Sequence, residues 1–339
     1  DVVDARHPGL MVPLVVDRPQ RLEMIAVPLE GNGGDEGVGD EVNSHPRSLA
    51  TRGGRSGRRR PAYHRVVSPT PTHDPLSALA ESEATGEAAL IFADIREAMN
   101  IPLVTSIWRV LAGIDGALES TWGLAGPIVR SGQVEASLAR LERDVSWPMP
   151  AQPIPGGAWR GDLVQIRAVV GAYTRSNSLS LLVLSALVAE PAGERIESPV
   201  PPPPGPWPNL PPLRAPDEFD ADTWAAVERV NRTGSTPDQP GVATLWRHLA
   251  DWPELLAAIE TAVAPLEADG VYAEALAQTR AIVGIEAGRL AHLRPVDAVL
   301  PAAARTFIEP YVTHPGLVQR MVVIGHVLAG WLDADGTPR

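Results

Sequence analysis

Apolar residues recur at helical spacing along most of the chain after residue 80. Ile91, Phe92, Ile95 and Met99 share one face of a helix, and Pro102 ends it. The same spacing predicts further helices over residues 133–144, 158–173, 179–189, 271–284, 296–311 and 317–331. No stretch alternates apolar and polar residues convincingly, as a half-buried strand does. The sequence therefore predicts an all-α fold.

Two segments of this helical pattern have almost the same sequence. Residues 104–112 read VTSIWRVLA and residues 242–250 read VATLWRHLA, so that Trp108 corresponds to Trp246 at an offset of 246 − 108 = 138. The same ungapped offset aligns Arg109 with Arg247, Leu118 with Leu256, Pro127 with Pro265, Gly132 with Gly270, and Tyr173 with Tyr311. We interpret this as an internal duplication of about 120 residues. It predicts two homologous helical repeats that form an intramolecular pseudo-dimer, with a pocket where they meet and the two tryptophans as core anchors.

Composition divides the chain into four segments. Ten of the nineteen residues of 198–216 are proline, which predicts an extended polyproline linker of roughly 60 Å. A docking site for a proline-binding module is the alternative interpretation. Residues 1–75 combine glycines, prolines and a run of arginines, which predicts a tail that forms no domain. The first repeat is then expected over 76–197 and the second over 217–334.

Charge and composition limit the partners. The net charge of −12 argues against a nucleic-acid partner, and no apolar run reaches the ~18 residues of a membrane helix. The chain has no cysteine, no HxxxH or HExxH histidine pair, no GxSxG and no phosphate-binding loop. We expect a cytoplasmic protein with a small-molecule ligand and with neither metal nor cofactor. A homodimer is left open.

Candidate polar residues are found where the two repeats differ. At the offset of 138, Asn177 corresponds to Pro315, and His314 replaces a serine. Asn177 is a candidate to hold a water or a carbonyl, or alternatively caps the helix that starts near Leu179. His314 is a candidate general base, or alternatively a surface or capping histidine. His248 is expected to face solvent.

Four stretches of the chain resemble one known family. They are ESEATGE at 81–87, IPLVTSIWRVLA at 101–112, the segment 173–187, and GVATLWRHLADWP at 241–253. The chain resembles the DehI family of group I 2-haloacid dehalogenases over residues 78–334 or so. The resemblance implies an all-α fold of two repeats and a cofactor-free hydrolase. In that family an aspartate activates a water that displaces halide directly from C2 of a 2-haloacid, without an ester intermediate.

The resemblance also implies site residues, and the base is the main departure. The family's catalytic aspartate falls on Leu245, whereas the asparagine that helps to hold the water is retained as Asn177. Substrate-binding positions fall on Leu103, Thr105, Ser106, Ser180, Ala243, Thr244, Leu245, Leu317, Val318 and Met321, and a further pocket position falls on His314. Leucine accepts no proton, and loss of a general base typically costs ~10²–10⁴ in rate. His314, with Asp251 as a second candidate, is the expected substitute.

Two hypotheses follow. In the first, the chain is a dehalogenase-like hydrolase, and either His314 is its base or the family's aspartate falls on a position other than Leu245. In the second, it is a member without dehalogenase chemistry that binds a small apolar or carboxylate ligand between the repeats. A carboxylate or histidine within reach of Asn177 across one water would favour the first hypothesis, and a pocket with neither would favour the second.

Overall fold

The described part of the chain folds as helices and connecting loops. The computed structural model describes residues 75–239 and 241–334, so the predicted tail lies almost wholly outside the described residues. No strand occurs in these ranges, and the all-α prediction is confirmed there. The α-helices are α1 (Gly86–Met99), α2 (Ser106–Leu111), α3 (Ala117–Arg130), α4 (Gln133–Asp144), α5 (Leu163–Val188), α6 (Ala221–Asn231), α7 (Thr244–His248), α8 (Pro253–Ala268), α9 (Val271–Ala291), α10 (Ala302–Thr313) and α11 (Arg320–Asp333).

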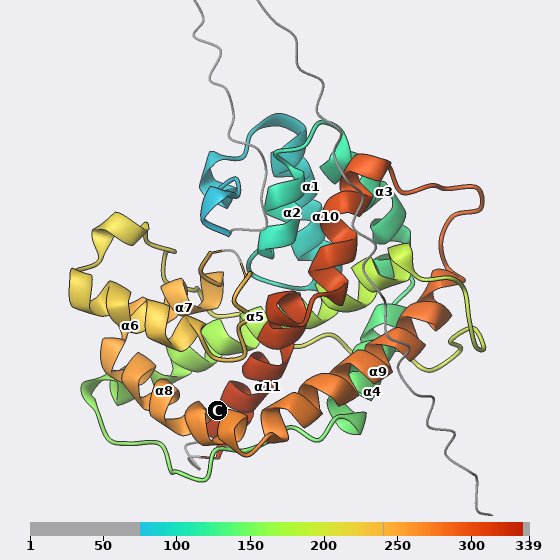
Figure 1. Ribbon diagram of the computed structural model, residues 1–339. Helices are drawn as coiled ribbons and strands as arrows, with labels where there is room; N and C mark the ends of the chain where they lie inside the picture. The colour runs from blue at the N-terminus through green and yellow to red at the C-terminus, as the bar shows by residue number, and fades with distance from the viewer. Residues whose placement is uncertain (1–74, 240, 335–339) are drawn as a thin grey trace, which may run out of the picture. The chain divides into compact units, whose positions relative to one another are not determined.

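Helix α5 is the central element of the described chain. Figure 1 shows it running through the middle of the fold, and it packs against α4, α9, α10 and α11. Most of its residues are buried, because its sequence is apolar or small on every face and a helix of that kind is stable only inside a core. Of these neighbours, α10 and the start of α11 also line the cavity described below, whereas no residue of α4 or α9 does.

Helix boundaries recur at the offset of 138. Helix α2 begins at residue 106 and α7 at residue 244, while α4 begins at residue 133 and α9 at residue 271. The residues before α4 and α9 are Gly132 and Gly270, with φ of 74° and 76°. Both adopt the left-handed conformation that glycine reaches without steric cost. Pro127 and Pro265 also lie inside corresponding helices, α3 and α8.

The segments related by the offset of 138 differ at the positions of Asn177 and Pro315, where one helix continues and the other ends. Two helices were predicted over 158–189, but α5 is continuous from Leu163 to Val188, so the predicted break after Tyr173 is wrong. In the second half a break is present, since α10 ends at Thr313 and α11 begins at Arg320. Pro315 explains the difference, because proline has no N–H and clashes with the preceding turn of a helix. Asn177 occupies the corresponding position in α5 and allows the helix to continue.

The proline-rich segment packs back on the helices. It contains no helix before the short turn Pro216–Glu218. The Trp207 indole donates to the carbonyl oxygen of Asn100 at 3.0 Å, and the Asn100 amide donates to the Pro204 carbonyl at 2.9 Å. These bonds tie the linker to the end of α1. The segment boundaries inferred from composition stay predictions.

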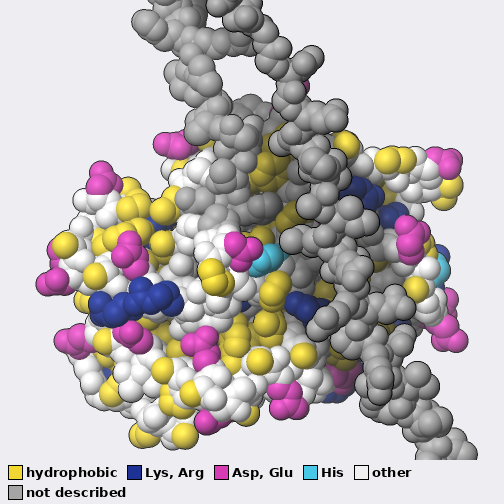
Figure 2. Space-filling view, in the orientation of Figure 1, with side chains coloured by type: hydrophobic (Ala, Val, Ile, Leu, Met, Phe, Trp, Pro, Cys, Tyr) yellow, Lys and Arg dark blue, Asp and Glu magenta, His cyan; other side chains and the backbone are white. Residues whose placement is uncertain are grey.

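The two repeated tryptophans are core residues, as predicted. Trp108 and Trp246 are both fully buried, each within a different one of two apolar clusters. On the visible face of the described residues, arginines are dispersed among acidic and apolar side chains and form no broad basic patch (Figure 2). No helix among the described residues is long and apolar enough to cross a membrane.

Candidate functional site

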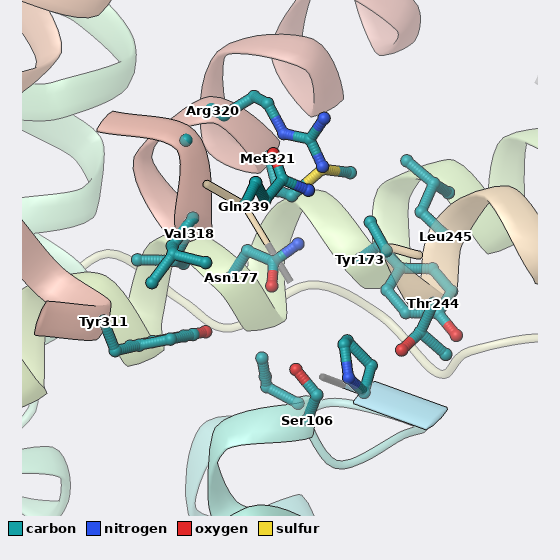
Figure 3. A pocket seen from close by; sticks show the side chains of 15 residues that line it. Ser106, Tyr173, Asn177, Gln239, Thr244, Leu245, Tyr311, Val318, Arg320 and Met321 are labelled. Carbon is teal, nitrogen blue, oxygen red and sulfur yellow. The ribbon is translucent and has the colours of Figure 1, made fainter. Parts of the chain in front are cut away.

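A small cavity lies beside the middle of α5. It encloses about 60 Å³ and opens between α2, α5, α7, α10 and the start of α11 (Figure 3). Its wall is formed by Pro75, Thr105, Ser106, Tyr173, Asn177, Gln239, Ala243, Thr244, Leu245, Tyr311, Gly316, Leu317, Val318, Arg320 and Met321. A cavity of this volume holds a few waters or one small organic molecule, at ~10–15 Å³ for each water.

The wall contains three pairs of residues that are 138 positions apart. They are Thr105 with Ala243, Ser106 with Thr244, and Tyr173 with Tyr311. The first two pairs lie at the starts of α2 and α7, and the tyrosines lie on α5 and α10. The segments that the duplication related in sequence therefore lie around one space.

Most of the substrate-binding positions predicted from the sequence lie on this wall. They are Thr105, Ser106, Ala243, Thr244, Leu245, Leu317, Val318 and Met321, together with Asn177. Leu103 and Ser180 do not. Leu103 is buried and belongs to an apolar cluster that also contains Trp159 and Ile166. Ser180 accepts a hydrogen bond from the Trp108 indole at 3.1 Å, so its hydroxyl belongs to the core.

His314 is not on the cavity wall. Its Nδ1 accepts from the backbone N–H of Gly316 at 3.2 Å, and its Nε2 lies 3.3 Å from Asp238 Oδ2. Its side chain is 31% exposed and that of Asp238 is 73% exposed, which places the pair at the surface. His314 thus fits the capping alternative and is poorly placed to take a proton from a water in the cavity.

Asn177 is directed at the cavity from the middle of α5. The predicted alternative, that it caps a helix near Leu179, is wrong because α5 continues through both residues. Its side chain makes no hydrogen bond with any described residue, although it is only 7% exposed. Figure 3 shows its amide pointing into the space between Tyr311 and Tyr173. A buried amide without protein partners is a binding group for a water or a ligand.

The described wall contains no aspartate, glutamate or histidine. Leu245, at the position where the family places its base, is 1% exposed and apolar. Tyr173 and Tyr311 are the titratable oxygens, and burial raises the pKa of both well above its usual range. Both phenols are therefore protonated at neutral pH. The cavity has hydrogen-bond donors but no side chain that accepts a proton readily.

The nearest buried histidine lies behind Tyr173. His248 is 4% exposed, so the expectation that it faces solvent is wrong. Its Nε2 lies 2.8 Å from the carbonyl oxygen of Pro211, which can only accept, so Nε2 carries a hydrogen. Burial lowers the pKa of His248, so the ring is neutral and Nδ1 accepts from the Tyr173 hydroxyl at 3.2 Å. This bond fixes the Tyr173 ring against the cavity.

Sequence reasoning named neither Arg320 nor Gln239 as a site residue, and it used Tyr173 and Tyr311 only as aligned positions of the duplication. Arg320 is 1% exposed at the start of α11. At the offset of 138 it corresponds to Leu182 of the first half, since 320 − 138 = 182. An arginine that replaces a buried leucine was the available signal. No group of side chains suited to a metal ion occurs among the residues that the structure describes.

The described residues form an all-helical fold around a small, largely apolar cavity whose described wall carries no carboxylate. No family model matches the chain, and no curated protein matches it. Solved structures of D-2-haloacid dehalogenases do match. A mutant in complex with D-2-CPA gives a TM-score of 0.58. An enzyme in complex with L-LA gives 0.57, and so does the crystal structure of a mutant. Each is 16% identical and covers 77% of this chain, and the match spans 95%, 96% and 95% of theirs. The chain has a fold similar to those enzymes.

Proposed function

We propose that the cavity binds a small carboxylic acid and does not catalyse hydrolytic displacement of halide. The observation that carries this proposal is the composition of the wall. The wall retains Asn177 and several hydroxyl groups. The base position is occupied by Leu245, and the described lining residues include no aspartate, glutamate or histidine. A general base that takes the proton of the attacking water typically accelerates such a step by ~10²–10⁴, and no such group is among the described lining residues.

We also propose that the chain is two copies of one helical unit, arranged as a pseudo-dimer within a single molecule. The recurring helix starts of α2 with α7 and α4 with α9 support this. The three pairs of wall residues at the same offset support it too. A cavity built in this way receives chemically different residues from equivalent positions, so one copy can vary without changing the fold.

A dehalogenase-like hydrolase is the second candidate. Asn177 favours it, because an amide directed into the cavity suits a held water. The fold similarity to D-2-haloacid dehalogenases favours it as well. The location of His314 at the surface, paired with Asp238, counts against the base that the sequence suggested.

Halide release from D- and L-2-chloropropionate tests the proposal. The full chain is expected to release no halide above the uncatalysed rate. Leu245→Asp is expected to release it, since it places a carboxylate on the wall beside the space that Asn177 faces. Leu245→Asn is the matched control, with the same shape and no basic group. Release by the unmodified chain that disappears in Asn177→Ala would overturn the proposal in favour of the hydrolase.

A further inference from the structure

Arg320 is the charged residue of the described cavity wall, and neutral oxygens hold it in place. Its Nη1 donates to the carbonyl oxygen of Thr233 at 3.1 Å and to that of Asn231. Its Nη2 donates to Asn231 Oδ1 at 3.2 Å. These bonds fix the guanidinium at the end of α6, while its side chain is only 1% exposed.

The guanidinium has donors left over. It carries five N–H hydrogens, and the three bonds use both hydrogens of Nη1 and one of Nη2. Nε is buried with no hydrogen-bond partner. One Nε hydrogen and one Nη2 hydrogen remain on adjacent nitrogens. This is the fork that binds the two oxygens of a carboxylate side by side.

Two further wall residues have buried polar atoms without partners. They are Thr244 Oγ1 and Gln239 Oε1. Gln239, Arg320 and Asn177 all line the cavity, and in the view of Figure 3 the first two are drawn above the Asn177 amide. Buried polar groups are nearly always hydrogen-bonded in native proteins, so unpartnered atoms around one cavity indicate a bound molecule that satisfies them.

The charge balance at this site also favours an anion. No described carboxylate forms an ion pair with Arg320, and none lies on the cavity wall. Burial lowers the pKa of Arg320 to about 10, which leaves it fully charged at neutral pH. The Glu267 carboxylate raises the pKa of Arg320 through its charge but forms no ion pair with it. An anion bound directly against the guanidinium adds the contact that its neutral partners do not supply.

We propose that Arg320 binds the carboxylate of a small 2-hydroxy acid in this cavity, through Nε and Nη2. This inference rests on the proposed function and names the anchoring residues. The Thr244 hydroxyl donates to the carboxylate, and Gln239 Oε1 accepts from the hydroxyl group on C2. A cavity of about 60 Å³ limits the acid to a size of roughly two or three carbons.

Binding of glycolate, L- and D-lactate and propionate to the full chain, measured by calorimetry, tests this inference. Lactate or glycolate is expected to bind about tenfold more tightly than propionate, because propionate leaves Gln239 Oε1 without a donor. Thr244→Val is expected to weaken lactate binding about tenfold. Thr279→Val is its control, because Thr279 Oγ1 is also buried and unpartnered but lies on α9, off the wall.

Arg320 and Gln239 are tested separately. Arg320→Lys keeps the charge and removes the fork, and it is expected to weaken lactate at least tenfold. Gln239→Leu is expected to abolish the preference for lactate over propionate while propionate binding stays within about twofold. Phosphate and chloride serve as probes for a site that accepts any anion. Should Arg320→Lys not fold, Thr244→Val and Gln239→Leu still decide the matter.

The outcomes separate the two proposals. If the unmodified chain binds none of these acids, the proposed function itself fails. If it binds them with equal affinity in Thr244→Val, Gln239→Leu and Arg320→Lys, the cavity binds acids but the assignment to these residues is wrong. Phosphate or chloride binding as tight as lactate would overturn the assignment to a hydroxy acid.

Discussion

The indole N–H of Trp108 donates to Ser180 Oγ at 3.1 Å, and this bond has no counterpart in the second half of the chain. The residue 138 positions after Ser180 is Val318, and Trp246 Nε1 is buried without a partner. Val318 lies instead on the cavity wall. Ser180 thus bonds a core tryptophan in the first half, whereas Val318 at the equivalent position lines the cavity in the second half.

Ser180→Ala is expected to lower the free energy of unfolding by about 1–3 kcal/mol. The substitution leaves the buried Trp108 N–H without an acceptor and removes the partner of Thr105 Oγ1, which lies 3.1 Å from Ser180 Oγ. Urea denaturation measures the change. Ser176→Ala is the comparison, because Ser176 is equally buried on α5 and its hydroxyl makes only a long bond of 3.4 Å to the Tyr173 carbonyl. Equal losses in the two variants would show that the Ser180 bond contributes nothing specific.

Gly325→Ala is expected to destabilise the crossing of α5 and α11. A Cβ at Gly325 would lie 2.6 Å from Thr174 Oγ1 and 3.2 Å from Thr174 Cα, so the helices must move apart, at a cost of about 1–3 kcal/mol. Gly284→Ala in α9 is the control, since a Cβ there meets nothing within 4 Å. That variant should gain about 0.5–1 kcal/mol from helix propensity. Thermal denaturation of both distinguishes packing from propensity.

Arg175→Met is expected to cost about 3–5 kcal/mol, because it breaks a largely buried ion pair and leaves backbone oxygens unpaired. Arg175 donates to Glu135 Oε2 at 3.0 Å, to the Met99 carbonyl at 2.8 Å and to the Asn100 carbonyl at 3.1 Å. Arg143→Met serves as control: its pair with Asp144 is exposed, so the loss should stay below about 1 kcal/mol. If denaturant titrations showed similar losses of unfolding free energy in the two variants, the buried pair of Arg175 would not be the more stabilising one.

Stability is expected to fall on acidification between about pH 6.5 and pH 4. Burial lowers the pKa of His326 to about 4 from its usual 6.5, and the ring stacks on Trp147 at 4.0 Å. In this window the unfolded chain binds a proton that the folded chain does not, so the free energy of unfolding decreases as pH falls. The loss is on the order of 1–3 kcal/mol.

His326→Phe keeps an aromatic ring against Trp147 and should flatten that pH dependence. Denaturant titrations at pH 7 and pH 4.5, for the unmodified chain and the variant, measure it. His248, whose pKa is also lowered, leaves a residual slope in the variant. An NMR titration in which His326 takes up its proton near pH 6.5 would contradict the assignment.

The helical spacing of apolar residues predicted helices well where no residue with a preference for helix ends interrupted it. The helix predicted over 133–144 matches α4, because glycine and the apolar spacing mark both its start and its buried face. The predicted break near Asn177 failed for a physical reason: asparagine favours caps but does not forbid the helix interior. Tertiary burial of α5 overrides that weak preference. Proline disfavours the interior of a helix more strongly, and the helix does end just before Pro315.

The sequence by itself determined the helical class, the offset of 138, the core tryptophans and most of the cavity positions. The helical class, the offset and the tryptophans follow from spacing and composition, which act locally or repeat along the chain, whereas the cavity positions came from the resemblance to a known family. Only the tertiary structure decided that His314 lies outside the cavity, that His248 is buried behind Tyr173, and that Arg320 lies on the cavity wall. The direction of a polar side chain depends on distant partners, such as Asp238, Pro211 and Asn231, that no local pattern reveals.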